Sequence, residues 1–193
     1  MTTMTIKSRP VYSRLELDPS GRRHLLLTGS HQTPPDAFAS GAAPGAFDGH
    51  WRIVSNSSAI PAPDERITEH SFRSETHLLI ALRRRLEEER MGLRLYAIGP
   101  EPFLWNVRAV AIEFGMAGEE VHLFAAGDAA RRVFCNHCRT ITDQVTTNIF
   151  PCSGCGAQLF VRDHFSRHIN AFAGVQVDAE VPGELPEIEE LYS

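Results

Sequence analysis

All four cysteines of the chain lie within one short stretch, CNHCRTITDQVTTNIFPCSGC, at residues 135–155. They form two Cys-x-x-Cys pairs separated by thirteen residues, Cys135 with Cys138 and Cys152 with Cys155. When each pair occupies the tip of a hairpin, four sulfur atoms can close a tetrahedron around one metal ion. Because so small a pair of hairpins buries little apolar surface, the metal would supply the free energy that folds it. The stretch therefore predicts a small ribbon built around a metal.

The four-thiolate ligand set favours zinc. Four cysteines complete a tetrahedral shell and leave no open position for water or substrate, so the ion would be structural rather than hydrolytic. The same ligands hold a single iron ion in rubredoxin-type sites, and the sequence does not exclude iron. A [2Fe-2S] cluster fits less well because plant-type ferredoxin spacing is not two symmetric pairs. Two disulfides would need an oxidising compartment.

The residues around the cysteines fit two tight metal-binding turns. Gly154 and Gly156 flank the last cysteine, where backbone amides must turn toward the sulfur atoms. The intervening TITDQVTTNIF is rich in β-branched residues and predicts a short hairpin. His137 lies between the first two cysteines, but since the four thiolates already complete the shell, we expect it to be exposed and not a ligand.

The size and charge of the chain limit what else it can be. Its 193 residues suffice for one domain and a small module. A net charge of -5 and a pI near 6.0, without a basic cluster, argue against a nucleic-acid partner. The N-terminus MTTMTIKSRP lacks a signal-peptide pattern, and no apolar run approaches the roughly 20 residues of a membrane span. We therefore expect a cytoplasmic protein with no nucleic-acid or membrane partner.

The N-terminal third alternates apolar runs with segments rich in proline and glycine. RLELD and HLLLTG predict two strands joined by a tight turn at PSGRR, and WRIVSNS predicts another short buried strand. SHQTPPDAFASGAAPGAFDGH is expected to form a long loop, and SSAIPAPDERITEHSF to be irregular.

A helix is predicted between Ser74 and Gly92. Leu78, Leu82 and Leu86 recur there at helical spacing, with Ser74 placed to cap the start and Gly92 to mark the end. The run RRRLEEE places three arginines before three glutamates. Pairing between residues four apart on the helix surface explains this run better than a phosphate site does.

The stretch LRLYAIG, PEPFLWNVRAVAIEFGMAGEE, VHLF reads as strand, helix and strand. Such a progression is typical of a parallel sheet covered by helices, so the predicted fold class is α/β. We expect an α/β domain over residues 1–130, a zinc-ribbon module over 131–180 and an acidic C-terminal arm over 181–193.

The segment VRDHFSRHINAF after the cysteines is predicted to be helical. Phe165, Ile169 and Phe172 would form an apolar stripe, with a basic edge, suited to a partner surface or, as the alternative, to the α/β domain of the same chain. His164 and His168 would share one helical face near Asp163, a spacing that can bind metal, although a polar face is the favoured interpretation. The C-terminal arm adds leucine and isoleucine among acids and is expected to become ordered only on a partner.

No motif of a self-sufficient enzyme occurs in the chain. G-x-S-x-G, the Walker loop and G-x-G-x-x-G are all absent, and the acids show no paired-carboxylate arrangement. We therefore assign no catalytic residue and no cofactor-binding residue besides the four metal ligands.

The stretch LYAIGPEPFLWNVRAVAIEFGMAGEEVHL resembles the last nicotinamide-binding unit of ferredoxin-reductase-type flavoproteins, whose strand ends in a Cys-Gly-Pro turn before a helix. Gly99 and Pro100 match that turn, and Ile98 stands where those reductases carry the cysteine beside the nicotinamide. LLLTGSHQTPP resembles a shortened form of their GGIGITP loop, with the Thr-Pro ending at 33–34 retained and Gly29 as the remaining glycine. The likeness implies a degenerate nucleotide-binding domain.

The C-terminal third resembles the small, cysteine-bearing subunit family of bacterial dimethylamine monooxygenase. The similarity covers about residues 133–180, including both cysteine pairs, VRDHFSR and VDAE. It implies a subunit of a complex that uses NADPH and oxygen to convert dimethylamine to methylamine and formaldehyde. It also implies that a haem-bearing subunit and a reductase subunit with FMN and a [2Fe-2S] cluster are the partners.

Three functions are compatible with these observations. The first, which we favour, is a non-catalytic structural subunit whose ribbon and arm dock the partner subunits. The second is an electron-transfer module with iron in the four-cysteine site and a residual nicotinamide pocket. The third is a free-standing zinc-ribbon binding protein, for instance one that touches nucleic acid, which the negative charge disfavours.

Overall fold

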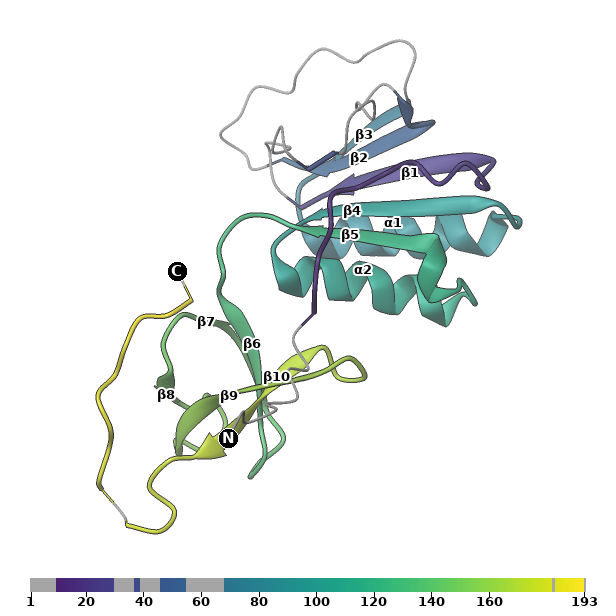
Figure 1. Ribbon diagram of the computed structural model, residues 1–193. Helices are drawn as coiled ribbons and strands as arrows, with labels where there is room; N and C mark the ends of the chain where they lie inside the picture. Colours follow the sequence, from purple (N-terminus) through teal and green to yellow (C-terminus); the bar gives the residue numbers. More distant parts are fainter. Residues whose placement is uncertain (1–9, 30–36, 39–45, 55–67, 182, 193) are drawn as a thin grey trace, which may run out of the picture. The chain divides into compact units, whose positions relative to one another are not determined.

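The computed structural model describes residues 10–29, 37–38, 46–54, 68–181 and 183–192. The chain divides into two compact units (Figure 1). The first, Tyr12–Gly127, is called the α/β unit below, and the second, which contains Asp128–Ser193, is called the four-cysteine unit. No helix in the described part of the chain is long and apolar enough to cross a membrane.

The α/β unit contains a sheet of five strands, and every neighbouring pair is parallel. The strands are β1 Arg23–Thr28, β2 Gly49–Ile53, β3 Thr68–Phe72, β4 Leu93–Gly99 and β5 Val121–Ala125. Their order in the sheet is β3-β2-β1-β4-β5. The predicted parallel sheet is confirmed, and its order is the one that doubly wound nucleotide-binding sheets use, with the change of direction between β1 and β4.

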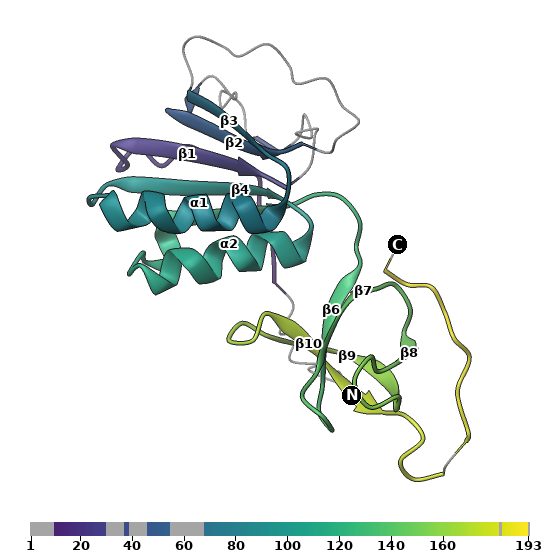
Figure 2. The same ribbon diagram turned by 180° about the vertical axis from the view of Figure 1, so that it is seen from behind.

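Both helices lie on one face of this sheet (Figure 2). Helix α1, Glu75–Glu88, connects β3 to β4, and helix α2, Glu101–Glu113, connects β4 to β5. The two connections run in the same direction along the sheet, so right-handed crossovers place both helices on the same side. The apolar side of α1 is the predicted one, with Leu78, Leu82 and Leu86 buried, and Ser74 caps its start.

The other face of the sheet carries a second core without a helix among the described residues. Leu26, Tyr96 and Ile98 are fully buried there, beneath Leu15 and Phe47 among others. The backbone N–H of Leu15 donates to the carbonyl of Ala37 at 2.7 Å. Among the described residues, the predicted helix cover is found on one face only; most of the β1–β2 and β2–β3 connections lies outside the described residues.

Two strand assignments in this unit were wrong. RLELD was expected to be a strand, but in it only Leu15 makes a bridge, to Phe38. The segment instead crosses the sheet face and turns at Asp18. In contrast, β3 was expected to be irregular. It is a mostly exposed edge strand with the sequence TEHSF, which lacks the apolar alternation that would identify it.

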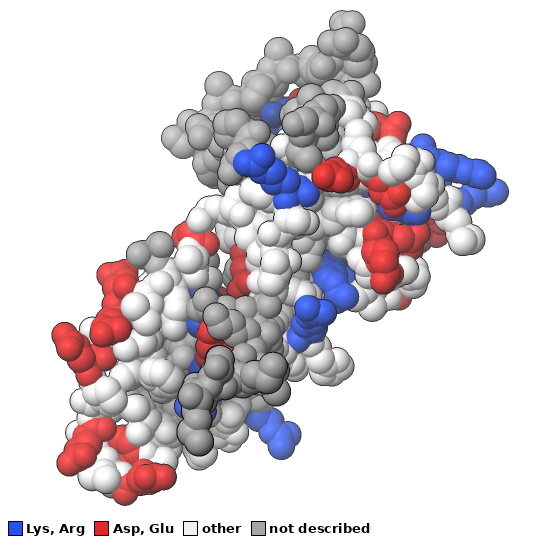
Figure 3. Space-filling view, viewed as in Figure 1, with Lys and Arg blue, Asp and Glu red and all other residues white. Residues whose placement is uncertain are grey.

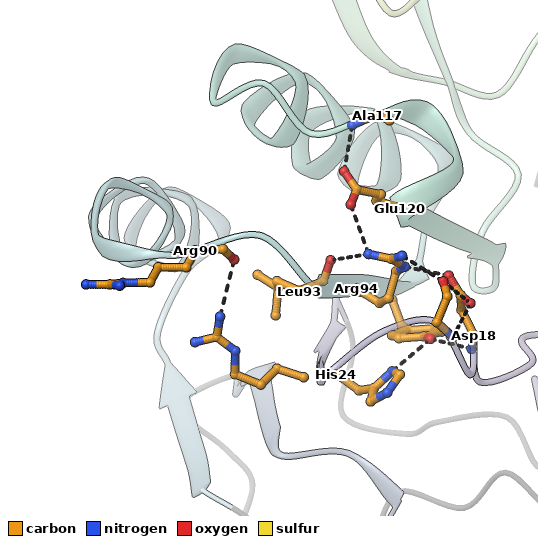
Figure 4. Close-up of polar contacts among 10 residues, drawn as sticks. Asp18, His24, Arg90, Leu93, Arg94, Ala117 and Glu120 are labelled. Atoms are coloured by element: carbon orange, nitrogen blue, oxygen red, sulfur yellow. Dashed lines mark hydrogen bonds and ion pairs between the residues drawn. The ribbon is translucent and has the colours of Figure 1, made fainter.

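Arg94 on β4 links the turn at Asp18 and Ser20 to the sheet through ion pairs and hydrogen bonds (Figure 4). Its guanidinium pairs with Asp18, donates to Ser20 Oγ at 2.8 Å and pairs with Glu120 at 2.9 Å. Hydrogen bonds from Ser20 and from Arg94 hold the pKa of the Asp18 carboxyl well below its usual range. The buried Tyr96 hydroxyl accepts the backbone N–H of Asp18 at 2.9 Å. Both the side chain and the backbone of Asp18 are therefore bonded to residues of β4.

The four-cysteine unit is a second five-stranded sheet, in the order β7-β6-β10-β9-β8. Its strands are β6 Arg131–Cys135, β7 Ile141–Val145, β8 Ile149–Pro151, β9 Gln158–Ser166 and β10 Ala171–Gln176. The pair β6–β10 is parallel and the others are antiparallel. TITDQVTTNIF does supply two strands, but the predicted hairpin is wrong because β7 and β8 lie at opposite edges of the sheet and pair with different neighbours.

The helix predicted after the cysteines is also wrong. That segment forms the β9–β10 hairpin, in which Phe165 and Phe172 face each other across the strands with ring centroids 5.0 Å apart. Both rings are buried, so the expected apolar stripe does not face a partner. His164 lies on β9 and His168 in the following turn, and the two do not share a helical face.

The C-terminal arm is ordered on its own unit rather than awaiting a partner. Asn148, in the connection between β7 and β8, donates its backbone N–H to the Glu189 carbonyl at 3.0 Å. Its side chain accepts the Glu189 N–H at 2.9 Å and donates to the Glu187 carbonyl at 3.2 Å. The Tyr192 ring is buried against Arg131. The expectation that the arm lacks order alone is therefore wrong.

Candidate metal centre

The four cysteines sit on two turns of matching geometry. The first turn begins where β6 ends, at Cys135, and the second begins just after β8, at Cys152. In the first, the N–H of Arg139 donates to the Cys135 carbonyl at 2.9 Å; in the second, the N–H of Gly156 donates to the Cys152 carbonyl, also at 2.9 Å. Each turn thus brings its two cysteines to one side of the same closed loop.

The residue after the second cysteine of each turn has a left-handed backbone. Gly156 has φ +75°, as its glycine suggests, and Arg139 has φ +68°, where a side chain is disfavoured. Gly154 serves a different purpose, because a Cβ there would lie 2.2 Å from Thr140 Oγ1 and 3.2 Å from Cys138 Sγ. The glycines correctly indicated an unusual backbone in the second turn, but nothing in the sequence indicated that Arg139 has the same left-handed backbone in the first turn.

Backbone N–H groups in both turns point at sulfur atoms. The N–H of Cys138 lies 3.5 Å from Cys135 Sγ, and the N–H of Gly154 lies 3.4 Å from Cys152 Sγ. Cys138 Sγ lies 3.3 Å from Thr140 Oγ1, and hydrogen bonding with Thr140 lowers the pKa of Cys138 to about 6. Desolvation and hydrogen bonds with the other three cysteines raise the pKa of Cys155 to about 11. The backbone N–H donors favour thiolates, the form that binds a metal.

The sulfur separations fit one tetrahedral ion. All four Sγ atoms lie within 4.8 Å of one another, with Cys135 to Cys155 at 3.9 Å and Cys138 to Cys152 at 3.6 Å. A tetrahedron with metal–sulfur bonds of about 2.3 Å has sulfur–sulfur edges of about 3.8 Å. A disulfide needs about 2.05 Å, and all four cysteines are free. The donor set therefore fits a single four-coordinate metal.

The two turns differ in exposure between their first and second cysteines. Cys135 and Cys152 are buried, whereas Cys138 is half-buried and Cys155 is exposed. His137 is exposed, as expected, and lies outside the ligand group. Among the described residues, the four cysteines are the only group of three or more His, Cys, Asp or Glu placed to hold a metal, so His164, His168 and Asp163 do not form a second site.

The sheet brings the two turns together. Thr142 follows the first turn on edge strand β7, and Ser153 belongs to the second turn beyond the opposite edge strand. Their hydroxyl oxygens lie 2.9 Å apart, and the N–H of Ser153 donates to Thr142 Oγ1 at 3.4 Å. The two edges of the sheet thus meet at the cysteines, an arrangement that the sequence did not indicate.

The turn that resembles a nicotinamide-binding site is tightly filled. The N–H of Gly29 donates to the Ile98 carbonyl at 2.8 Å, so it is already used inside the sheet. A Cβ on Gly29 or Gly99 would lie within 3.0 Å of the Phe103 ring, at 2.7 and 2.8 Å respectively. Both glycines are therefore required by the close approach of Phe103. Residues 33–34, which carry the rest of the resemblance, lie outside the described residues.

A buried polar cluster on the sheet face opposite α1 and α2 was not anticipated. Thr28 Oγ1 lies 3.1 Å from His50 Nε2, and His50 Nδ1 lies 3.8 Å from Glu69, which also pairs with Arg52. Burial, with repulsion from Arg52, lowers the pKa of His50 to about 4. Thr28, His50 and Glu69 are arranged in the order of a catalytic nucleophile, base and acid. However, Thr28 is only 2% exposed, so a substrate cannot reach its hydroxyl. The cluster is a buried structural network.

Both units match domain models of one protein family. Residues 55–121 match the model for the N-terminal domain of DmmA-like dimethylamine monooxygenase subunits, and residues 132–175 match the model for their C-terminal domain. The delta subunit of the heme-dependent oxidative N-demethylase of Ectopseudomonas mendocina (strain ymp) is 34% identical over 176 residues, covering 91% of each chain. The chain belongs to the DmmA-like subunit family. No solved structure matches it.

The family match contains the whole candidate metal centre. All four cysteines fall within the 132–175 match to the DmmA-like C-terminal domain. The match to the N-terminal domain covers β3, α1, β4 and α2 of the α/β unit.

Proposed function

We propose that this chain is a non-catalytic structural subunit of a haem-dependent, NADPH- and oxygen-using oxidative N-demethylase that converts dimethylamine to methylamine and formaldehyde. The observation that supports this proposal is the relative described above, the delta subunit of a heme-dependent oxidative N-demethylase, which is 34% identical over 91% of both chains. A match of this length includes both units, so the proposal concerns the whole chain.

The four-cysteine site supports a structural role within that complex. We propose that Cys135, Cys138, Cys152 and Cys155 bind one zinc ion, with their sulfur atoms at near-tetrahedral separations. When bound, zinc supplies the free energy that holds the two turns and the edges of the sheet together. With four thiolate ligands the shell is closed, so the chain would offer the reaction no metal-bound water.

The redox groups are proposed to lie on other subunits. Haem would belong to one partner, and FMN, a [2Fe-2S] cluster and the NADPH site to a reductase partner. In support, the relative is named as one subunit, delta, of a heme-dependent enzyme. The glycine amide that a pyrophosphate would need, that of Gly29, is bonded to Ile98.

The test is assembly and activity with and without the full-length chain. The remaining subunits of the complex are expressed with the tagged chain and without it, and complex size and dimethylamine-dependent NADPH oxidation are measured. We expect one co-eluting complex with the chain, loss of assembly and activity without it, and no turnover by the chain alone. A complex that assembles and turns over fully without the chain would refute the structural role.

Elemental analysis of the isolated chain tests the metal. We expect about one zinc per chain and no visible colour. Stoichiometric iron with visible absorption would instead support an electron-transfer module, because a ferric four-thiolate site is coloured and redox-active.

A further inference from the structure

The C-terminal arm is held on one side and open on the other. The N–H groups of Leu191 and Tyr192 donate to the Thr146 carbonyl at 3.0 and 2.9 Å, and Asn148 bonds to the backbone of Glu187 and Glu189. These contacts all run from one side of the arm to the connection between β7 and β8. Because the arm is already ordered, a partner that binds it need not supply the entropy cost of ordering it.

The open side of the arm concentrates exposed apolar side chains. Nine large apolar residues among the described ones are markedly exposed, and four of them fall in the eleven residues 181–191. These four are Val181 at 51% exposed, Leu185 at 44%, Ile188 at 56% and Leu191 at 54%. Scattered exposed apolar residues need no explanation, but a local concentration of them marks an interaction surface.

The same segment is strongly acidic. The sequence contains no lysine or arginine from residue 168 onward. Four glutamates within residues 181–191 are exposed, Glu184, Glu187, Glu189 and Glu190, and the exposed Glu180 directly precedes them. Figure 3 shows acidic side chains gathered along one edge of the four-cysteine unit, over the course that the arm follows in Figure 1.

We infer that the open side of the C-terminal arm is a docking surface for a partner protein that presents an apolar groove bordered by lysine and arginine. The inference rests on the proposed function, because it names the surface through which the chain would join the complex. The acids disfavour nucleic acid and anionic membranes, which repel negative charge. They also disfavour pairing of two arms from two copies, since like charges would face each other.

The experiment measures affinity between the full-length chain and the other subunits of the N-demethylase, purified together without this chain. Two variants address the surface: Ile188→Glu removes apolar contact, and the pair Glu187→Lys with Glu190→Lys reverses its charge. Each should raise the Kd by about tenfold or more, which corresponds to about 1.4 kcal/mol. The wild-type Kd should also rise with salt, since charge pairs at the edge of an interface are screened.

Matched control variants lie on the exposed surface of the α/β unit. Ile112→Glu changes an isoleucine of similar exposure, 44%. Glu87→Lys with Glu88→Lys reverses two exposed acids on α1. Both controls should keep the wild-type Kd within about twofold, well below the tenfold effect expected of a contact residue. Circular dichroism of every variant checks that the four-cysteine unit remains folded.

The outcomes separate the two proposals. If the wild-type chain does not bind the other subunits, the proposed function fails and the docking surface with it. If the wild-type chain binds and the arm variants bind equally well, the docking surface alone is wrong. If the arm variants abolish a dimer of the chain, measured by light scattering, and leave subunit binding unchanged, the occupant is a second copy and the inference is overturned.

Discussion

Replacing Tyr192 with alanine should destabilise the four-cysteine unit, although the residue stands next to the end of the chain. Its side chain is buried, and its ring centroid lies 3.9 Å from the guanidinium carbon of Arg131. Arg131 is itself only 6% exposed and lies 4.1 Å from the Phe172 ring centroid. The guanidinium is thus enclosed by two aromatic rings, one from the β9–β10 hairpin and one from the arm.

The magnitude follows from the two contributions that the ring makes. Burying an aromatic side chain stabilises by about 1.5–3 kcal/mol. A cation over a ring away from water adds about 0.5–2 kcal/mol. Because Arg131 keeps its ion pair with Asp163 at 3.2 Å, its charge is not left uncompensated when the ring is removed. We therefore expect Tyr192→Ala to lower the free energy of unfolding by about 2–5 kcal/mol, which overlaps the range of about 3–5 kcal/mol for aromatic truncations in cores.

The assay is urea unfolding of the metal-loaded full-length chain, followed by near-ultraviolet circular dichroism and by capture of released metal with a coloured chelator. Tyr192→Phe keeps the ring and should change the free energy by less than about 0.5 kcal/mol. Leu191→Ala is the matched control, because Leu191 is the neighbouring residue and is exposed. If Tyr192→Ala unfolds at the same urea concentration as Leu191→Ala, the arm is not held by this ring and the reasoning is refuted.

Four further predictions concern the metal turns, the sheet and the nucleotide-like site. Cys152→Ser should open the metal site, unfold the four-cysteine unit and dissociate the complex while the haem and flavin spectra of the partners stay unchanged; slower electron transfer in an intact complex would contradict the structural role. Arg139→Gly should stabilise the unit by about 1 kcal/mol and Gly156→Ala should destabilise it by a similar amount in chemical denaturation, since both positions have left-handed backbone. The pKa of His50 is lowered to about 4 in the folded chain, so below pH 6.5 the unfolded chain binds the proton first. The free energy of unfolding should therefore fall as the pH drops from 6.5 to 4, by up to about 3 kcal/mol, and His50→Gln should flatten this slope in urea titrations. Calorimetric titration of the isolated chain with NADPH should give no saturable heat, because the Gly29 amide is bonded to Ile98; a micromolar Kd would show that the nucleotide site is intact.

The parts of the fold that local pattern determines were predictable from the sequence. Helix α1 has a capping serine and leucines at helical spacing, and the strand-helix-strand run through α2 has long apolar segments closed by glycine. The cysteine spacing identified four residues whose sulfur atoms do lie within 4.8 Å of one another. In each case a short stretch carries the whole signal, so no distant contact was needed to interpret it.

The errors arise where distant contacts override the local pattern. Phe165 and Phe172 are seven residues apart, which suits two turns of a helix, but here they face each other across a hairpin whose turn lies between them. The residues of β7 and β8 looked like a hairpin because they are β-branched and adjacent, yet their partners are β6 and β9. Pairing choice depends on the whole sheet, which periodicity alone does not encode.

The segment after the cysteines forms the β9–β10 hairpin and not a helix, so the four-cysteine unit offers a partner fewer exposed apolar surfaces. A helical stripe at Phe165 and Phe172 would have offered one apolar surface and the arm a second. Since both rings are buried inside the unit, Phe165→Glu would disrupt its core and say nothing about a partner. Deleting the arm is equally ambiguous, because it also removes the buried Tyr192. Single changes at outward residues such as Ile188 therefore separate assembly from stability, since they alter the exposed side and leave the ring in place.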